Sequence, residues 1–269
     1  MSKRLQDLTI LIKGAGEMAT GIACRLFRAN FRRILLLEIA APLAVRRQVS
    51  FCEAVYDGRA RVEGIDAWLV AGEAAIERAW AAGCIAVAVD AAGESVGRLR
   101  PEVVIDATLA KRNLGLHIED APLVIGLGPG FEAGRDCHLV VETNRGHDLG
   151  RVLMAGRAEA NTGIPGAIRG YTVERVLRSP GEGRFVAVKA IGDPVTKGEQ
   201  VGSVGGNQVV AAIDGIVRGL IRPGTLVGHG MKIGDIDPRG EPAYCATVSE
   251  KANAIGGAVL EAILSVYNR

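Results

Sequence analysis

The residues best suited to bind a phosphate-bearing ligand lie near the start of the chain. Gly14 permits a tight turn from a strand into a helix, Gly16 lets the backbone approach a pyrophosphate, and Ala19 is small enough for helix and strand to touch. The N–H groups and the dipole at the helix start then favour an anion. We therefore predict a cofactor-binding loop made of Gly14, Ala15, Gly16, Glu17, Met18 and Ala19.

Glu38 is the acidic residue expected to complete this loop, because it ends the next apolar run. An acid at that point commonly bonds ribose hydroxyls and repels a 2′-phosphate. Glu17 opposes a bound phosphate, since its negative side chain stands at the helix start. A tight turn without any ligand stays an alternative, because the glycine pattern alone is a weak signal.

Further candidate ligand residues follow the later apolar runs. Asp106 lies in the run 103–108, and Lys111 follows it in a chain that is otherwise rich in arginine. The amine of Lys111 could pair with a phosphate or pterin-type anion. Gly128 and Gly130 flank a proline in a turn whose exposed N–H groups would permit close approach of a ligand. A solvated lysine and a strained strand-to-strand turn are the alternative interpretations.

A polar run follows the predicted strand 138–143. Glu142, Arg145 and His147 could bind an anion or perform acid–base work, although a surface loop held by ion pairs is the alternative. Asp136 and His138 lie nearby, but the spacing fits no strong metal-binding motif. We predict no metal ion.

The elements that would position these residues alternate between strand and helix. Apolar runs at 8–13, 33–38, 84–90 and 103–108 are typical of parallel strands buried on both faces, and helices are expected at 17–29, 42–56 and 73–82. Arg46 and Arg47 lie in the helix expected at 42–56, where they would either reach an anionic ligand or face solvent. This order predicts an α/β fold with a Rossmann-like doubly wound sheet.

Beyond residue 170 the pattern changes to short apolar runs separated by glycine, proline and aspartate, as in a small sandwich or barrel. The turns resemble those of biotinyl and lipoyl domains, but the hairpin 203–208 has no carrier lysine. Thr247 and Glu250 form a capping-box pattern before a final amphipathic helix. We predict a Rossmann-like nucleotide-binding domain over 1–165, a barrel-sandwich hybrid domain over 166–246 and a C-terminal helix over 247–269.

Composition limits the class of protein. The chain has 269 residues, of which 48% are apolar, and a net charge of +2, which fits a globular protein and argues against a nucleic-acid surface. No apolar run is long enough to cross a membrane, and the five scattered cysteines form no zinc-like pattern. We expect a cytoplasmic protein with reduced thiols, no membrane association and no nucleic-acid partner.

Long segments carry a resemblance to a known family: GAGEMATGIACRLFRANFRRILLLEIAAPLAVRRQVSFCEAVYDG, DATLAKRNLGL and NTGIPGAIRGY. They resemble the YqeB-like selenium-dependent molybdenum hydroxylase accessory proteins, which are related to XdhC-type maturation factors. The resemblance covers nearly the whole chain. It implies a maturation factor with an XdhC-like Rossmann domain that serves a molybdenum hydroxylase client.

The leading hypothesis is therefore a maturation factor whose loop binds NAD(P) or the pterin dinucleotide of a molybdenum cofactor. An NAD-dependent oxidoreductase acting on a small metabolite and a non-catalytic scaffold for a client hydroxylase are the alternatives. Whether the protein is an enzyme stays open, because no tyrosine–lysine pair or hydride-transfer histidine is evident. The expected partners are the client hydroxylase and a nucleotide-type small molecule, and self-association stays open.

Overall fold

The computed structural model describes residues 4–268, which divide into two compact units. The first unit contains the chain up to Pro42, then Ser50–Asn161, and the segment that starts at Val248. The second unit contains Leu43–Val49 and Thr162–Thr247. Separated stretches of sequence build each unit, so the units differ from the three consecutive parts expected at 1–165, 166–246 and 247–269.

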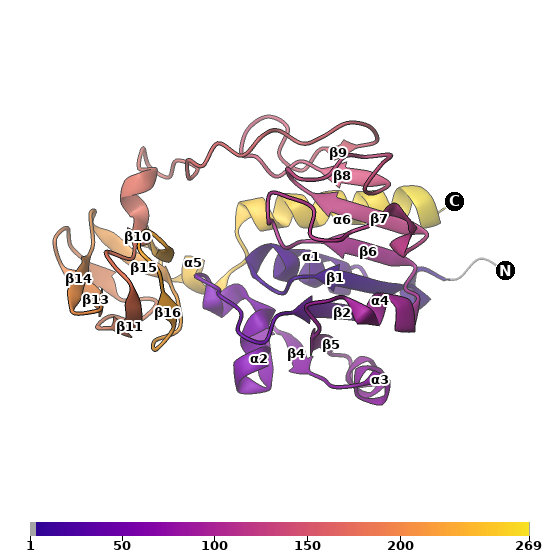
Figure 1. Ribbon diagram of the computed structural model, residues 1–269, viewed down its shortest axis with the longest axis horizontal. Coiled ribbons are helices and arrows are strands. Elements are labelled where there is room, and N and C mark those ends of the chain that lie inside the picture. Colours follow the sequence, from indigo (N-terminus) through magenta and orange to yellow (C-terminus); the bar gives the residue numbers. More distant parts are fainter. Residues whose placement is uncertain (1–3, 269) are drawn as a thin grey trace. The chain divides into compact units, whose positions relative to one another are not determined.

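A nine-stranded sheet forms the centre of the first unit (Figure 1). Its strands lie in the order β3-β4-β5-β2-β1-β6-β7-β8-β9. All neighbours from β4 through β8 are parallel, whereas β3 and β9 pair antiparallel at the two edges. The strands are β1 (Thr9–Lys13), β2 (Arg33–Glu38), β3 (Arg59–Val62), β4 (Ile65–Leu69), β5 (Ile85–Val89), β6 (Val103–Asp106), β7 (Leu123–Leu127), β8 (Leu139–Val141) and β9 (Val152–Leu153).

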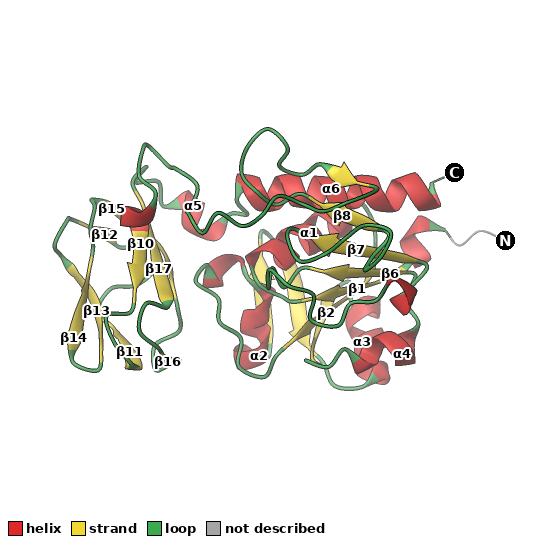
Figure 2. Cartoon of the chain, turned by 45° about the horizontal axis from the view of Figure 1, so that its top comes forward, coloured by secondary structure: helices red, strands yellow, loops and turns green. Residues whose placement is uncertain are grey.

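Both faces of this sheet are covered. α1 (Glu17–Arg28) and α6 (Glu250–Tyr267) lie side by side along it in both ribbon views (Figures 1 and 2). Successive strand residues face opposite sides, and one side packs Leu11 and Val124 with Trp80 of α3 (Glu73–Ala81). The remaining helices of the unit are the short α2 (Ala54–Asp57) and α4 (Glu94–Leu99). Covering on both faces explains why the central strands read as unbroken apolar runs.

The fold class expected from the sequence is wrong. The sheet is mixed, and residues 107–138, all of which the structure describes, contain no α-helix between β6, β7 and β8. Leu116, Phe131 and Cys137 fill the space that crossover helices would cover in a doubly wound sheet. The sequence did not reveal the antiparallel edges, because β3 is mostly exposed and β9 has only two residues.

The C-terminal helix α6 belongs to the first unit. Ser249 is its N-cap and accepts a hydrogen bond from Ala252 N at 3.4 Å, so the capping box expected at Thr247 is wrong. The apolar spacing correctly predicted the buried side of the helix, which includes Ile255, Val259, Ala262 and Ile263. At its far end, Tyr267 Oη donates to Glu102 O at 2.9 Å, just before β6 begins.

Small residues let α1 and α6 approach closely. A Cβ atom at Gly21 would lie 2.7 Å from Ala252 Cβ, and one at Gly256 would lie 3.1 Å from Gly21 O and from Arg25 Cβ. The contacts advance in the same direction along both helices, which therefore run parallel. Since α1 begins directly after β1, α6 also begins at the edge where the parallel strands end.

Two four-stranded antiparallel sheets form the second unit (Figure 2). Phe185, Val201 and Ile233 are among the buried residues of its core. One sheet is ordered β10 (Val176–Arg178), β17 (Lys232–Asp237), β15 (Gly215–Leu220) and β12 (Pro194–Val195); the other is ordered β14 (Asn207–Val210), β13 (Gln200–Val204), β11 (Gly183–Ala187) and β16 (Leu226–Val227). A short helix, α5 (Ala243–Ala246), lies near the end of the unit's sequence.

The second unit differs from the expected biotinyl- or lipoyl-like domain because residues far away in sequence help to build it. A Cβ atom at Gly219 would lie 2.8 Å from Val45 O, and Arg47 Nε donates to Leu220 O at 2.8 Å. The helix expected at 42–56 is also wrong. That segment forms 3₁₀ turns at Arg47–Val49 and Phe51–Glu53 before α2, and it is divided between the two units.

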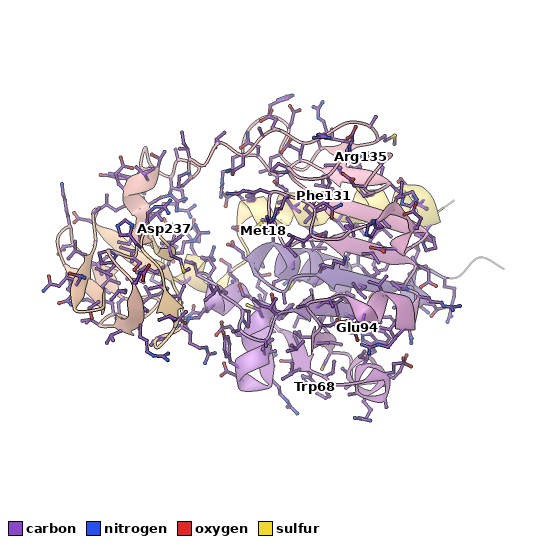
Figure 3. All side chains as sticks on the ribbon, viewed as in Figure 1. Met18, Trp68, Glu94, Phe131, Arg135 and Asp237 are labelled. Atoms are coloured by element: carbon purple, nitrogen blue, oxygen red, sulfur yellow. The ribbon has the colours of Figure 1, made fainter. Side chains whose placement is uncertain are left out.

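A network of buried charges lies within the second unit, around the residue labelled Asp237 in Figure 3. Asp237 accepts hydrogen bonds from Arg239 Nε at 2.9 Å and Nη2 at 2.6 Å, and Arg218 Nε lies 3.5 Å from Asp237 Oδ2. Asp235 pairs with Arg175. Burial raises the pKa of Asp237, but the hydrogen bonds from Arg239 and the charge of Arg218 outweigh burial and hold the pKa below its ordinary value.

Replacing Asp237 with Asn should lower the free energy of unfolding at neutral pH by about 3 kcal/mol, because buried Arg218 and half-buried Arg239 lose an anionic partner. A carboxylate whose pKa is lowered by folding stabilises the protein above its unfolded pKa, and this stability is lost as pH falls through the folded pKa. When urea unfolding is measured over a range of pH, the free energy of unfolding of Asp237→Asn should therefore fall less on acidification than that of the wild type. Glu182→Gln, at an exposed position of the same unit, is the control; equal pH dependence in wild type and Asp237→Asn would contradict the prediction.

Replacing Gly21 with Ala should destabilise the protein by about 1–3 kcal/mol, because the added methyl group overlaps Ala252 in the contact between α1 and α6. Gly257→Ala is the matched control within α6, because a Cβ atom there would meet nothing within 4 Å. This control should stabilise by about 0.5–1 kcal/mol through the lower backbone entropy of the unfolded chain. Chemical denaturation measures both variants, and the same sign for the two would count against the packing described.

Candidate functional site

The predicted glycine loop connects β1 to α1. Gly14 has a φ of +94°, and a Cβ atom there would lie 3.3 Å from Ala107 O, so the fold itself requires glycine at this position. Gly16 is the N-cap of α1, with an extended backbone at φ −71° and ψ −173°, and a Cβ atom there would meet nothing within 4 Å. A side chain at position 16 would therefore extend into open space at the start of α1, close to the residue labelled Met18 in Figure 3.

Buried hydrogen bonds support the loop from beneath. Ala15 O accepts from Cys52 N at 2.9 Å and from Thr20 Oγ1 at 3.1 Å, and Thr20 Oγ1 in turn accepts from Phe51 N at 2.9 Å. Ala15 and Ala19 are fully buried. Two of the six predicted loop residues therefore support the loop, while Gly16, Glu17 and Met18 are half-buried at its outer side.

Glu38 lies beside the loop, as expected, but its carboxylate binds the protein backbone. Oε2 accepts a hydrogen bond from Ala15 N at 2.9 Å, and Oε1 accepts from Ile39 N at 2.8 Å. Both oxygens are engaged, so the side chain connects the glycine loop to the end of β2. The sequence predicted a contact between Glu38 and a ribose, whereas the contacts that the structure gives Glu38 are with the backbone.

Asp106 and Lys111 follow β6. Asp106 is buried, and its Oδ1 accepts from Thr108 N at 3.0 Å and Thr108 Oγ1 at 2.6 Å, so this carboxylate shapes the turn that follows the strand. Lys111 is exposed, with a φ of +61°. A Cβ atom at Gly130 would lie 2.6 Å from Arg112 N. The structure thus brings the segment of Lys111 next to the turn that contains Gly130.

The glycines of the turn 126–130 pack against neighbouring residues. A Cβ atom at Gly126 would overlap the side chain of Phe131, and one at Gly128 would overlap Thr143 Oγ1. Gly128 and Gly130 also have positive φ angles of +73° and +112°. Internal packing therefore accounts for these glycines, and nothing in their geometry requires a ligand.

A cavity of about 630 Å³ opens at the ends of β4 and β5. Leu69, Val89 and Leu99 contribute apolar lining, and Asp90 lies at its border. Asp90 Oδ1 accepts from Glu94 N at 3.0 Å and Oδ2 from Ser95 N at 2.8 Å, so its side chain caps α4. The sequence did not signal this cavity, because its lining combines apolar residues with Glu73, Ser95 and Arg98 from separate elements.

Hydrogen bonds connect the cavity to the glycine loop across neighbouring strands. Asp90 N donates to Glu38 O at 2.9 Å, and Ala15 N donates to Glu38 Oε2. β5, β2 and β1 are adjacent in the sheet, so the loop and the cavity border are separated by two strand spacings, or about 10 Å. Open space at a helix start and an apolar cavity therefore lie along one edge of the sheet.

The polar run 142–147 is mainly structural. Glu142 is buried, and its two oxygens accept from Asn144 N at 2.6 Å and from Glu159 N at 2.7 Å. Arg145 forms an ion pair with Glu250 in the first turn of α6. Lys251, which the sequence analysis did not single out, follows Glu250 and lies in this same group of charges.

The other predicted ligand groups are held by the backbone. His138 Nδ1 accepts from Val124 N at 3.0 Å. Arg46 Nη2 donates to Tyr244 O at 2.8 Å and to Thr247 O at 2.9 Å, all within the second unit. Among residues 4–268, no group of three or more His, Cys, Asp or Glu side chains is arranged to hold a metal ion.

The five cysteines are buried and carry reduced thiols. Burial raises the pKa of Cys24 to about 12 and that of Cys137 to about 11. Since the thiolate is the reactive form, these two positions are poorly suited to nucleophilic chemistry. Across the described chain, no helix combines the length and the apolar character that crossing a bilayer requires.

The chain is similar to one curated protein over most of its length. It is 46% identical over 260 residues to the uncharacterized protein YqeB of Escherichia coli (strain K12), a match that covers 97% of this chain and 48% of YqeB. The chain thus spans about half the length of this relative. No protein-family model matches the chain. The similarity supports the YqeB part of the expected resemblance and shows no link to XdhC-type factors or selenium-dependent molybdenum hydroxylases.

Similarities to solved structures are weak. A succinylglutamate desuccinylase/aspartoacylase of Rhodobacter sphaeroides is 22% identical, with a TM-score of 0.23, over 32% of this chain and 29% of that chain. An aspartoacylase family protein of Mesorhizobium loti is 12% identical, with a TM-score of 0.25, over 54% and 60% of the two chains. TcdA (CsdL) is 14% identical, with a TM-score of 0.33, over 98% and 90%. At these scores the neighbours assign neither fold nor activity to this chain.

The functions expected from the sequence are corrected by these findings. The relative with 46% identity is named only as an uncharacterized protein, so no comparison links this chain to molybdenum hydroxylase maturation or to NAD-dependent oxidation. The carboxylate expected to hold a ribose binds Ala15 N and Ile39 N instead. The roles of molybdenum hydroxylase maturation factor, NAD-dependent oxidoreductase and client scaffold are therefore not retained.

Replacing Glu38 with Gln should lower the free energy of unfolding by about 1–3 kcal/mol, because the new NH₂ group faces a backbone N–H donor that loses its acceptor. Amide hydrogen exchange at Ala15 should rise in the same variant. Glu119→Gln, at an exposed position, is the control and should leave both measurements unchanged. Unchanged exchange at Ala15 in Glu38→Gln would show that the carboxylate does not hold the loop.

Proposed function

We propose that the first unit binds a nucleotide-type small molecule that carries a diphosphate group, at the edge of the sheet where the parallel strands end. The main support for this proposal is that glycine occupies position 16. Neither its backbone angles nor its neighbours require glycine, and Ser, Asp or Asn would cap the helix at least as well. A side chain at this position would occupy the space where an anion would accept hydrogen bonds from the first turn of α1.

The cavity at the ends of β4 and β5 is the expected binding place for the base of the ligand. Its lining is mainly apolar, with Glu73 and Arg98 among the lining residues, and its border lies about two strand spacings from the loop. A flat base can enter an apolar cavity while its diphosphate stays at the helix start. NAD(P) and a pterin dinucleotide, the two expected cofactors, both contain this diphosphate, which is the group that the helix start would recognise. The expected protein client, self-association and cytoplasmic location stay predictions.

Replacing Gly16 with Val should weaken the binding of ADP by about tenfold or more, because the side chain fills the space in front of α1. The variant should fold normally, with a stability loss below about 1 kcal/mol, since Gly16 has an extended backbone and open surroundings. Isothermal titration calorimetry with ADP measures the affinity, and chemical denaturation measures the stability.

Gly228→Val is the matched control, because this glycine of the second unit also has open surroundings. It should bind ADP with wild-type affinity. The proposal would be refuted by wild-type protein that gives no binding heat at millimolar ADP, or by a Gly16→Val variant that binds ADP as tightly as the wild type.

A further inference from the structure

Arg218 lies at a β-bulge of β15 in the second unit. Val217 and Gly219 on either side of it pair with Ile236 and Asp235 of β17, so the register between the two strands shifts at Arg218. A bulge leaves one residue without a direct partner on the neighbouring strand and changes the direction of its side chain. Bulges of this kind are frequent next to binding sites.

The side chain of Arg218 lies on the outer face of its sheet, near the residue labelled Asp237 in Figure 3. Ile236 belongs to the core between the two sheets, so Asp235 and Asp237 face the opposite side of the strand. Arg218 Nη1 lies 3.9 Å from Asp235 Oδ2, and Arg218 Nε lies 3.5 Å from Asp237 Oδ2. The arginine is therefore held between two carboxylates.

Other parts of the second unit cover this strand. A Cβ atom at Gly219 would lie 2.8 Å from Val45 O, and Cys245 Sγ lies 3.8 Å from Val217 O. The segment that contains Val45 and the helix α5 therefore both pack against β15. Only 6% of the Arg218 side chain stays exposed, and its Nε atom is fully buried.

Both carboxylates beside Arg218 accept their hydrogen bonds from other arginines. Asp235 accepts from Arg175, and Asp237 accepts from Arg239 Nε at 2.9 Å and from Arg239 Nη2 at 2.6 Å. The distances from Arg218 are longer than the range of about 2.7–3.2 Å that is usual for N–H···O hydrogen bonds. Within residues 4–268, Arg218 Nε has no hydrogen-bond acceptor.

A buried guanidinium group with an unmade hydrogen bond is unfavourable, because the donor has lost its water and gained no acceptor. The two ion pairs of Arg218 supply electrostatic attraction, but they do not replace the missing hydrogen bond. The planar guanidinium group matches the geometry of an oxyanion, which can accept from two of its N–H groups at once. A bound oxyanion would therefore supply the acceptor that the chain does not.

The neighbouring charges favour a carboxylate over a phosphate as this oxyanion. Asp235 and Asp237 both lie within 3.9 Å of Arg218 and would repel an incoming anion. A carboxylate carries one negative charge, whereas a phosphate monoester carries about 1.5 to 2 at neutral pH, so the repulsion is weaker for the carboxylate. The small exposed fraction of Arg218 also favours a small molecule.

We propose that Arg218 binds the carboxylate of a small organic acid on the covered outer face of the sheet that contains β15 and β17. Asp235 and Asp237 hold the guanidinium group in place through the two ion pairs, while Arg218 Nε and its neighbouring N–H groups donate to the ligand. This site lies within the second unit and does not depend on the diphosphate site proposed for the first unit.

Acetate is the probe for the direct test, because it is a small molecule with a single carboxylate. The Nε–H signal of Arg218 in a ¹⁵N NMR spectrum of the whole chain is assigned by its loss in Arg218→Lys. In the wild type this signal should shift saturably with sodium acetate at constant ionic strength and should not shift with sodium chloride. Inorganic phosphate should require about a tenfold higher concentration than acetate.

Stability gives a second measurement, because a ligand that binds the folded state raises the urea midpoint. Acetate should raise the midpoint of the wild type above its value in equal chloride, and Arg218→Met should lose this rise. Arg218→Lys should lose most of it, since an ammonium group lacks the planar fork. Arg184→Met, at an exposed position of β11 in the same unit, is the matched control and should keep the full rise.

An Arg218 signal that does not move with acetate, or that moves equally with chloride, would overturn the inference. A rise in the urea midpoint that persists in Arg218→Met would overturn it as well, and so would saturation by phosphate without saturation by acetate. If Arg218→Met does not fold, the NMR titration of the wild type decides. Each of these outcomes leaves the binding of ADP by the first unit untouched, because Gly16→Val tests that binding separately.

Discussion

The close contact of α6 with α1 is the constraint on which the first unit depends. The connections between β6, β7 and β8 contain no α-helix in the described chain, so the end of the chain supplies the cover that crossover helices would provide. Gly21 and Ala252 leave room for this cover, because any larger side chain would separate the two helices. The same contact places two helix starts at one edge of the sheet, where their dipoles act together.

Buried carboxylates in the two units are satisfied by different partners, and in both units these partners give the carboxylates a structural role. In the second unit, Asp235 and Asp237 are each paired with arginine, which satisfies the desolvated charges within the chain. In the first unit, Glu38 and Glu142 are satisfied by backbone N–H groups.

Much of the central sheet could be predicted from the sequence, and the reason is local. β1, β2, β5 and β6 appear as unbroken apolar runs because both faces of the sheet are buried, and α1 follows directly from the glycine turn. The antiparallel edge strands could not be predicted, because edge positions tolerate polar residues and β9 is very short. The apolar spacing of the segment 42–56 predicts one helix, because the spacing carries no information about the division of this segment between two units.

The sequence by itself determined the features that depend on neighbouring residues: the turn at Gly14, the buried strands and the apolar side of α6. Only the tertiary structure decided what the candidate site residues do. Glu38 accepts a hydrogen bond from the backbone of the glycine loop, and the cavity forms from residues on four elements. The physical reason is that backbone conformation and burial periodicity are local properties, whereas a polar group's partner depends on every element that packs around it.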